Sequence, residues 1–375
     1  MTKKLYDTKP YETKFSAQVI SCIPSTNGYD VVLDQTLFFP EEGGQSCDKG
    51  TLNGIEVVDV QIHEGCIHHY LSKEINGKVE GKIDWVHRYS NMQNHSGEHI
   101  LSGLVHSLYG YNNVGFHLGS DEVSADYDGF LNDEQIQNLE TKVNEVIMAN
   151  KTIHCWYPED VETINYRSKK EIKEAIRIVE IEDVDVCACC APHVQKTSEV
   201  GFFKILKTMK HKKGIRLSFL CGKRAFEHIQ TIYQQAQKIS VLLSAPIDDI
   251  YSFVEKNNKE IYALKQEKVL LQKQKIDSQI QNLEIKDHYI LFEDDMDANT
   301  QKYYLNQLKP FFVDYGVIFV KQETNYRFLL VSNKDARNQL KQLKDHFPVR
   351  GGGKQNNIQG TVEATKEQLL SVLMK

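Results

Sequence analysis

Hydrophobic positions in the first part of the chain follow the period of β-strands. Residues 15–90 contain short apolar or alternating runs that Gly, Asn and Pro interrupt at regular intervals. The clearest runs are Ala17–Ile20, Tyr29–Leu33, Gly54–Val58 and Cys66–Tyr70. Many short strands at even spacing are typical of small barrels and sandwiches. The pattern therefore predicts a small N-terminal β-barrel over residues 1–90.

After Met92 the spacing changes to that of helices. Apolar residues at positions 100, 101, 104, 105 and 108 share one face of a helix that Gly110 would end. A second helix is predicted over 133–149, with Asp133 near its N-cap, and strand-like pieces recur through 114–128 and 200–221. Helices mixed with strands in this way predict an α+β core over residues 91–225.

Residues 226–286 are predicted to form a helical arm. The stretch 223–285 has no glycine and a single proline, Pro246. Positions 250, 254, 257, 261, 264, 268 and 271 alternate four- and three-residue steps, and apolar residues occupy most of them. This seam is typical of a coiled coil, so we expect an arm bent near Pro246 that joins two chains into a homodimer. The alternative is a long surface helix packed on its own domain.

The last segment, residues 287–375, reads as a compact α/β domain because predicted strands alternate with predicted helices. The strands are expected at 289–292, 317–321 and 327–331, and the helices at 299–315, 335–346 and 366–374. The whole chain is thus predicted to be a multidomain α+β protein of four parts.

Composition narrows the class of protein. No run approaches the roughly 18 apolar residues of a membrane span, and the N-terminus lacks the apolar stretch of a secretory signal. The eight cysteines cluster around 187–190, which favours thiols and a metal site over a disulfide framework. The net charge of −6 excludes a general basic coat but allows local basic patches. We therefore expect a cytoplasmic protein with no membrane contact and, without a GxxxxGK or GxGxxG loop, no nucleotide cofactor.

The most informative residues are two pairs of metal-ligand type. His95 and His99 are four positions apart on a predicted helix, so both imidazoles can reach one ion. Cys189 and His193 form a C-x₃-H pair 90 residues after His99. Together they predict a tetrahedral zinc site with three histidine ligands and one cysteine ligand. Spacing alone leaves Cys187 and Cys190 as competing thiols.

Glu98 adds a second interpretation. The sequence His95-Ser-Gly-Glu-His99 also fits H-x-x-E-H, a zinc peptidase signature in which the glutamate activates a water molecule. On a helix Glu98 flanks the face that carries His95, so it is a candidate catalytic base. An ordinary exposed carboxylate is the alternative. A cysteine ligand argues against a peptidase, which usually takes a carboxylate as its third ligand.

Taken together, these segments resemble a known family. Residues Gln93–Leu101, followed by Cys189 and His193, look like the editing domain shared by alanyl- and threonyl-tRNA synthetases and the free-standing AlaX proteins. The upstream stretch Leu33–Gln45, LDQTLFFPEEGGQ, resembles the family's L-D-x-T-x-F-Y-P-x-G-G-G-Q segment. The chain departs from the family pattern at Gly97, Glu98 and Glu42, and Glu42 stands where that segment has a glycine.

The resemblance continues to the end of the chain. Gly201–Ile205 and Gly214–Gly222 match the strands expected after the C-x₃-H pair, and Arg350–Lys354 is similar to the glycine motif of the DHH-associated C-terminal domain of alanyl-tRNA synthetase. This order is that of the long form of AlaX. It implies an aminoacyl-tRNA deacylase, a carboxylic ester hydrolase, that edits tRNA(Ala) mischarged with Ser, and possibly with Gly, in trans. A non-catalytic tRNA-binding protein with structural zinc is the further alternative.

The resemblance also suggests contacts to the substrate. Thr36 and Gln45 are expected near the amino-acid pocket, and Gly43 and Gly44 are expected where bare backbone lets the terminal adenosine approach. Taken alone, these four residues also fit a strand and a hairpin turn. The tRNA itself is expected to meet Lys212 and Lys213 within a local basic stretch, and Arg350, Gly351, Gly352, Gly353 and Lys354 in a glycine loop.

Overall fold

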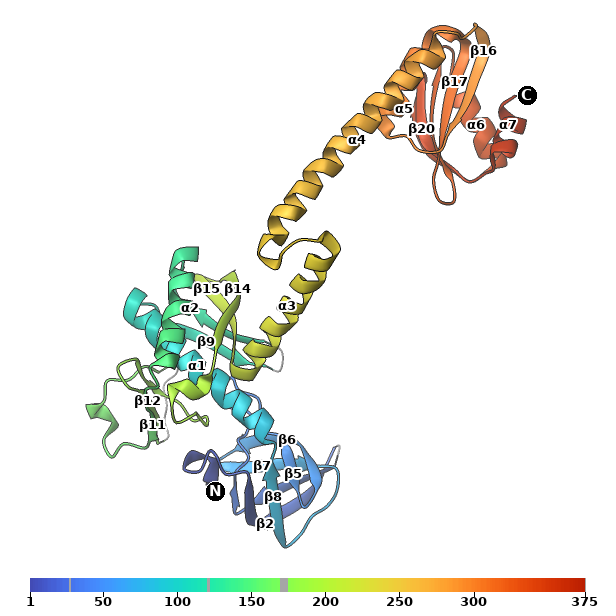
Figure 1. Cartoon of the computed structure of the whole chain (residues 1–375). Coiled ribbons are helices and arrows are strands. Elements are labelled where there is room, and N and C mark those ends of the chain that lie inside the picture. The colour runs from blue at the N-terminus through green and yellow to red at the C-terminus, as the bar shows by residue number, and fades with distance from the viewer. Residues whose placement is uncertain (27, 120–121, 169–174, 375) are drawn as a thin grey trace. The chain divides into compact units, whose positions relative to one another are not determined.

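The computed structural model describes residues 1–26, 28–119, 122–168 and 175–374, which form two compact units. The first unit is Met1–Gln237 and the second is Lys238–Lys375 (Figure 1). Each unit mixes helices with sheets, so the predicted multidomain α+β class is confirmed.

The first unit begins with a closed antiparallel barrel of strand order β2-β3-β7-β6-β5-β8, as the strand pattern predicts. Alternate residues such as Val31, Leu33 and Val79 fill its interior, which closes a core of its own. The barrel ends at Ile83, before the predicted limit of 90. Its strands are β2 (Lys14–Ser25), β3 (Gly28–Leu33), β5 (Gly50–Leu52), β6 (Ile55–His63), β7 (Cys66–Leu71) and β8 (Lys78–Ile83).

A short N-terminal segment runs beside the barrel. Strand β1 (Lys3–Lys4) pairs in parallel with β4 (Gln35–Thr36), and the 3₁₀ turn η1 (Leu5–Asp7) follows it. Leu5 and Tyr6 are buried in the barrel cluster. This packing holds the first residues of the chain against the stretch that precedes the glycine turn.

Helix α1 (Trp85–Tyr109) is the central element of the first unit. It starts earlier than predicted because the Asp84 carboxylate accepts a hydrogen bond from His87 N and caps it, and it ends at Gly110 in the left-handed conformation, as predicted. His95 and His99 therefore lie in the middle of the helix and not at its head. Nearly every α1 residue from Arg88 to Val105 is buried, polar residues included, so α1 runs through the core and not over it.

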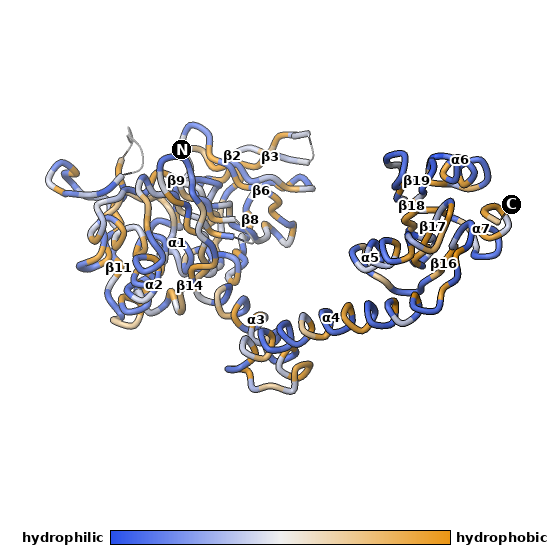
Figure 2. Tube along the Cα trace, turned by 90° about the horizontal axis from the view of Figure 1, so that it is seen from above, coloured by the Kyte–Doolittle hydropathy of each residue, from blue (hydrophilic) through white to orange (hydrophobic). Residues whose placement is uncertain are grey.

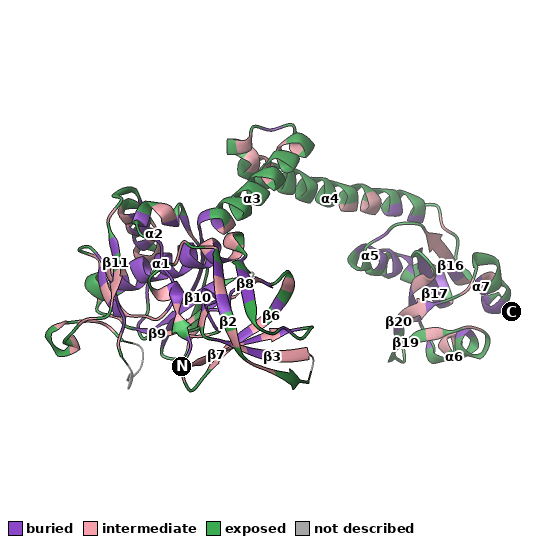
Figure 3. Ribbon diagram, turned by 90° about the horizontal axis from the view of Figure 1, so that it is seen from below, coloured by how far each residue is buried: buried purple, intermediate pink, exposed green. Residues whose placement is uncertain are grey.

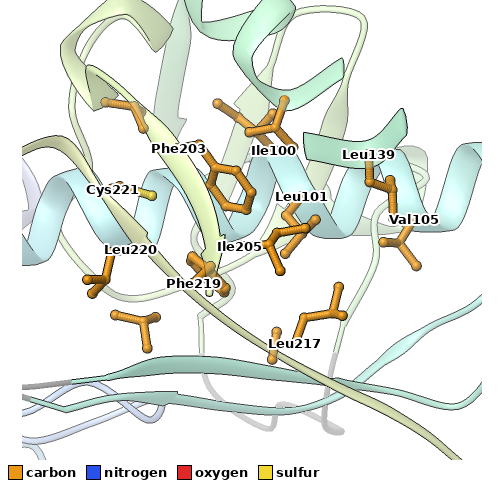
Figure 4. Packing of buried hydrophobic residues seen from close by; sticks show 14 of the residues in the cluster. Ile100, Leu101, Val105, Leu139, Phe203, Ile205, Leu217, Phe219, Leu220 and Cys221 are labelled. Carbon is orange, nitrogen blue, oxygen red and sulfur yellow. The ribbon is translucent and has the colours of Figure 1, made fainter. Parts of the chain in front are cut away.

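A four-stranded antiparallel sheet, ordered β14-β15-β10-β9, packs on α1 and on α2 (Asp133–Met148). Figure 4 shows Phe203, Leu217 and Phe219 of the sheet meeting Ile100 and Leu101 of α1. A second antiparallel sheet, β11-β12-β13, contacts α1 at Val184 and Asp185. The bounds are β9 (Asn113–Leu118), β10 (Val123–Tyr127), β11 (Ile153–Trp156), η2 (Val161–Thr163), β12 (Ile178–Ile181), β13 (Asp185–Ala188), η3 (Thr197–Val200), β14 (Phe203–His211) and β15 (Gly214–Cys221).

The predicted arm consists of two helices. Helix α3 (Gly222–Leu243) spans the boundary between the units, and α4 (Ile250–Ile280) belongs to the second. Residues 244–246 and the turn η4 (Ile247–Asp249) separate the two helices. The sequence predicts a bend here, near Pro246. Hydrophobic and hydrophilic residues alternate along α4 (Figure 2), and most of its length is exposed (Figure 3).

The second unit is built on one mixed sheet, ordered β16-β17-β18-β20-β19. The end of α4 and helix α5 cover one face, and α6 and α7 cover the other. Only β16 and β17 are parallel, so the predicted α/β pattern holds for one β-α-β unit and the rest is antiparallel. The bounds are β16 (Lys286–Glu293), α5 (Ala298–Leu308), η5 (Lys309–Phe311), β17 (Phe312–Lys321), β18 (Tyr326–Ser332), α6 (Arg337–His346), β19 (Val349–Lys354), β20 (Asn357–Val362) and α7 (Lys366–Leu373).

Two expectations for the second unit are wrong. The helix predicted over 299–315 ends at Leu308, because Pro310 lies in the 3₁₀ turn η5 and the strand β17 begins at Phe312. The glycine loop predicted at 350–354 is the edge strand β19, in which Gly351 and Gly353 lie so close to the β20 backbone that a Cβ would clash with it.

None of the helices in the described part of the chain is both long enough and apolar enough to cross a membrane.

Candidate metal centre

Four side chains of potential ligands converge inside the first unit. His95 and His99 come from α1, and Cys189 and His193 come from the loop that follows β13. Their ligand atoms all lie within 4.8 Å of one another, and the Cys189 Sγ is 3.5 Å from His95 Nε2 and 3.4 Å from His193 Nε2. The structure thus brings together the four residues that the sequence predicts as ligands.

Each histidine of this cluster is held by its other ring nitrogen. His95 Nδ1 donates to Gln45 Oε1 at 2.7 Å, His99 Nδ1 bonds Asp185 Oδ2 at 3.2 Å, and His193 Nδ1 bonds Ser96 Oγ at 3.1 Å. In His95 and His193 the nitrogen that faces Cys189 is Nε2. Partners of this kind orient the ligands of metal sites and set their tautomers. The arrangement is preorganised for one ion.

The electrostatics of the cluster favour a thiolate. Burial opposes ionisation of Cys189, but His95 and His193 beside it hold the pKa of this thiol well below its usual value. Imidazole nitrogens together with a thiolate are a donor set that suits zinc in tetrahedral coordination.

The structure separates the three neighbouring cysteines. Cys189 alone of the three belongs to the four-residue cluster found among the described residues. The Cys187 thiol lies near His99 and Asp185, but both Asp185 oxygens already accept hydrogen bonds from Arg167, at 2.7 and 2.8 Å. The Cys190 thiol lies near Gly43 and makes a side-chain hydrogen bond with Glu42.

A cavity of about 550 Å³ opens beside the cluster, with His95, His99 and Cys189 in its wall. The remaining wall comes from six places in the chain: the N-terminal segment, the glycine turn, β9, the residue after β11, described residues before β12, and the end of β13 with the loop after it. The other residues lining it are Lys4, Glu42, Gly43, Gly44, Val114, Gly115, Phe116, Tyr157, Ser168, Ala175, Ile176, Arg177, Cys187, Ala188 and Cys190.

The glycine turn lies where the resemblance predicts it. Gly43 and Gly44 have φ values of 65° and 85°, which favour glycine, and both line the cavity. Gly44 O accepts a hydrogen bond from Leu118 N at 2.7 Å, and a Cβ on Gly44 would clash with the Phe116 carbonyl. The two glycines let the backbone pass closely over β9.

Thr36 and Gln45 do not line the cavity in the described part of the structure; both are buried. The Thr36 hydroxyl bonds His69 Nε2 at 2.9 Å and accepts from Phe38 N at 3.0 Å. Gln45 acts through His95, while its Nε2 has no hydrogen-bond partner among the described residues. The direct substrate contacts expected of these two side chains thus stay predictions.

Glu98 occupies a different place from the one expected. Its buried carboxylate accepts hydrogen bonds from Ser102 Oγ and Asn113 Nδ2, each at 2.5 Å. It lies neither in the ligand cluster nor among the described residues that line the cavity. The alternative of an exposed carboxylate is wrong, because Glu98 is buried and ties α1 to β9. Its role as a catalytic base stays a prediction.

The predicted tRNA contacts lie on two separate surfaces. Lys212 and Lys213 form the exposed turn of the β14–β15 hairpin. Arg216, in the same basic stretch, is engaged by Asp126 through hydrogen bonds of 2.6 and 2.8 Å. In the second unit, the stretch from Arg350 through Gly351, Gly352 and Gly353 to Lys354 is exposed along β19.

Sequence reasoning missed the residues that support the ligands. Arg177 donates from Nη1 to the carbonyls of Cys189 and Ala191, at 3.1 and 2.9 Å, and so holds the ligand loop in shape. Asp185 and Ser96 carry no motif of their own. Ser96 lies one position after a predicted ligand, which is the only signal that could have drawn attention to it.

The geometry defines an α+β protein with a cluster of three histidines and one cysteine that could hold a metal ion, beside a cavity of about 550 Å³. Comparison with known proteins shows which family of this class the chain resembles. The model of the threonyl and alanyl tRNA synthetase second additional domain matches residues 176–217, the segment that carries Cys189 and His193.

Similar proteins agree with this match. The alanyl-tRNA editing protein AlaX-L of Pyrococcus horikoshii is 30% identical over 416 aligned residues, which cover 100% of this chain and 98% of that protein. The alanyl-tRNA editing protein Aarsd1 of Danio rerio is 32% identical over 68% of this chain and 67% of that protein. An alanine–tRNA ligase of Methanococcus maripaludis is 26% identical over 100% of this chain but only 43% of the ligase. The chain belongs to the AlaX-L family of alanyl-tRNA editing proteins.

Proposed function

We propose that the protein hydrolyses the ester bond of tRNA(Ala) mischarged with serine, and of tRNA(Ala) mischarged with glycine, at a zinc centre. Its family makes it an aminoacyl-tRNA deacylase. Beyond this assignment, the proposal specifies which amino acids are removed, which metal is bound and which residues bind that metal.

The observation that carries the proposal is the cluster of His95, His99, Cys189 and His193 in the wall of a cavity. When bound there, zinc would supply positive charge that polarises or anchors the aminoacyl group. Gln45, Asp185 and Ser96 would keep the three Nε2 atoms directed at the ion. These contacts fix the ligands before any substrate arrives.

The protein's own part in the reaction is mainly positioning. The Gly43–Gly44 turn exposes backbone to the cavity, so the terminal nucleotide can lie against it without meeting a side chain. An aminoacyl ester is already activated, and holding it next to a water molecule in a fixed geometry removes much of the entropic barrier. No strong base is required at the site.

Discrimination among amino acids follows from a second selection step, which acts after the synthetase has charged the tRNA. An alanine-activating pocket cannot exclude glycine and rejects serine poorly, since an added hydroxyl costs little in an apolar site. A site that hydrogen-bonds the serine hydroxyl leaves polar groups unpaired when alanine is bound, which discriminates by about 10⁴-fold or more. Ala-tRNA(Ala) should therefore be spared.

The peptidase alternative, with His95, Glu98 and His99, loses its main support because Glu98 is engaged by Ser102 and Asn113. The non-catalytic alternative has one observation in its favour: four protein ligands are typical of a structural zinc site. Activity decides between this alternative and an editing centre.

A deacylation assay tests the proposal. Purified protein is incubated separately with Ser-, Gly- and Ala-tRNA(Ala), and the remaining ester is counted against a control without enzyme. We expect loss of the seryl and glycyl esters only, and loss of this activity in His95→Ala. Cleavage of a peptide panel with intact esters would establish the peptidase, and tRNA binding without any hydrolysis would establish the non-catalytic protein.

Contacts to the body of the tRNA are proposed on two surfaces. Lys212 and Lys213 project from a hairpin turn and are free to meet phosphates of the acceptor stem. Arg350 and Lys354 flank the three glycines of β19 and would meet phosphates elsewhere. Such contacts position the nucleic acid without reading its sequence. Because charged tRNA is used where translation takes place, we place the protein in the cytoplasm.

A homodimer is proposed through α4. Within the seam, Val254, Ile261, Leu264 and Leu271 are 41–57% exposed, which leaves an apolar stripe of coiled-coil spacing uncovered. Light scattering on the full-length protein should give twice the chain mass, and replacing Ile261 and Leu264 by Glu should give a monomer. A monomeric wild type at micromolar concentration would refute this pairing.

A further inference from the structure

The chain carries one acidic side chain at a place in the cavity wall where the family pattern has glycine. Glu42 precedes the turn Gly43–Gly44 and lines the same cavity as His95, His99 and Cys189. Its neighbour Glu41 is exposed and accepts from Gln61 Nε2 at 3.2 Å. The two adjacent glutamates thus have different surroundings.

The turn geometry directs the Glu42 side chain toward the metal cluster. Glu42 N donates to Gln45 O at 3.2 Å and Gln45 N donates to Glu42 O at 3.1 Å, so the two residues form a hydrogen-bonded antiparallel pair. Directly paired residues project from the same face of a hairpin. The Gln45 side chain on that face reaches His95 Nδ1. Glu42 therefore leaves the turn on the metal side.

One oxygen of this carboxylate lacks a partner. The Glu42 carboxylate makes a side-chain hydrogen bond with Cys190, but its buried Oε2 has no hydrogen bond to any described residue. Nearby, the buried Tyr6 hydroxyl is also without a partner among the described residues. Leaving a buried charged acceptor unpaired costs free energy, so a bound ligand that brings a donor gains by pairing with it.

The chemistry of an aminoacyl ester supplies such a donor. Its aminoacyl end carries one cationic group, the α-ammonium, with up to three N–H donors. Charge-assisted hydrogen bonds to a carboxylate are about twice as strong as neutral ones. A serine or ribose hydroxyl could also donate, but it would not neutralise the carboxylate.

We propose that Glu42 is a specificity-determining residue that binds the α-ammonium group of the aminoacyl ester and thereby selects substrates with a free amine. This inference rests on the proposed function. The carboxylate in the cavity wall fixes the amine, so the ester carbonyl and the side chain of the amino acid are held at defined places in the cavity. N-blocked aminoacyl or peptidyl esters, which lack the cation, are disfavoured.

The test compares Ser-tRNA(Ala) with N-acetyl-Ser-tRNA(Ala), each measured against its own spontaneous hydrolysis. In Glu42→Gln we expect kcat/KM for Ser-tRNA(Ala) to fall about 10- to 100-fold, the value of a charged hydrogen bond, while the rate on the acetylated ester is unchanged. Glu42→Gly, which restores the family's residue and keeps the turn, should behave in the same way. Glu41→Gln is the matched control and should leave both rates unaltered, and zinc content should be equal in all variants.

Other outcomes overturn the inference. An equal loss on both esters would show that Glu42 supports the turn or the chemistry and not the amine, and unchanged rates on both would show that it makes no contact. Failure of the proposed function gives a different result, because the wild type itself would then leave Ser-tRNA(Ala) intact.

Discussion

At the scale of single residues, the candidate metal centre depends on side chains outside the four-residue cluster. The three Nδ1 contacts, made by Gln45, Asp185 and Ser96, decide which nitrogen of each histidine faces Cys189. Asp185 has the additional task of pairing with Arg167, and Ser96 also accepts from Val194 N. Among the described residues, Gln45 has no second side-chain hydrogen bond that its replacement would remove.

Replacing Gln45 by Ala should therefore weaken zinc binding. Without its Oε1 the His95 ring is free to rotate or to change tautomer, and losing an outer partner of this kind typically costs about 10- to 100-fold in metal affinity. Competition with a chromogenic chelator measures the change. Gln18→Ala, at an exposed position on the barrel, is the control. An unchanged zinc affinity in Gln45→Ala would mean that the Gln45 contact does not orient His95.

A second residue-scale prediction concerns pH. His69 is fully buried, bonds Val31 O through Nδ1 and Thr36 Oγ1 through Nε2, and burial lowers its pKa to about 4. The unfolded chain binds this proton at pH values near 6.5 and the folded chain does not, so stability falls as pH decreases from 6.5 toward 4.

The expected contribution is a loss of about 2 kcal/mol between pH 7 and pH 5. Urea unfolding at both pH values should show this loss in the wild type and a smaller loss in His69→Gln, which has no group that titrates there. Equal losses in the two proteins would assign the pH dependence to other groups.

The convergence of His95, His99, Cys189 and His193 could be predicted because the spacing within each pair is a local property of the chain. An i, i+4 pair on a helix and a C-x₃-H pair are visible in the sequence, and zinc chemistry connects them. The surroundings of Glu98 and Thr36 could not be predicted in the same way. Their partners, Asn113 and His69, are 15 and 33 positions away, and only the packed fold brings them together.

At the scale of elements, the position of α1 depends on how closely it approaches its neighbours. A Cβ on Gly97 would clash with the Cys221 thiol, and one on Gly103 would clash with the Val184 carbonyl. The family pattern that this segment resembles has alanine at the position of Gly97. In this chain the buried Cys221 of β15 takes that space.

Gly97→Ala should accordingly destabilise the protein by about 1–3 kcal/mol, although alanine is the better helix former by about 1 kcal/mol. The double variant Gly97→Ala, Cys221→Ala should recover much of this loss, because the second change removes the sulfur that the new methyl group meets. Chemical denaturation of the four proteins gives the coupling free energy. Additive effects would show that the two side chains do not compete.

Element prediction succeeded where a local pattern was long and failed where two patterns met. The strands of the barrel and the end of α1 at Gly110 follow from alternation and from a left-handed glycine. The apolar residues of 311–315 continue a helical pattern, yet Phe312 and Tyr315 belong to a central strand paired on both sides. At Phe312 and Tyr315, burial within the sheet outweighs the local helical pattern. The run Arg350–Lys354 was expected to be a loop because glycine disfavours strands, and it is a strand because β20 lies beside it.

At the scale of the whole molecule, the two compact units suggest that ester hydrolysis and tRNA binding depend on different parts of the chain. The metal cluster and its cavity belong to the first unit, and the glycine strand β19 belongs to the second. If the second unit contacts only distant parts of the tRNA, its removal should affect binding and leave the chemistry intact.

We therefore expect a protein of residues 1–243, which keeps the first unit and all of α3, to retain zinc and to hydrolyse a seryl minihelix at the full rate. Its KM for whole Ser-tRNA(Ala) should rise about tenfold or more and should depend less steeply on salt, because fewer phosphate contacts remain. Steady-state kinetics at two salt concentrations on both substrates measure this. The same loss on the minihelix and on the whole tRNA would assign the second unit to folding or dimerisation.

The separation of the ligands along the chain has a consequence for how the protein is made. His99 and Cys189 are 90 positions apart, and the segment between them contains α2 and most of the strands of the core. During synthesis α1 leaves the ribosome well before its partners exist, so no complete ion site can form until His193 has emerged. An ion bound after that moment would connect the two ends of the intervening segment, and its free energy of binding would add to the free energy of folding. Supply of zinc in the cell would thus set how many newly made chains reach their final state as well as how many are active.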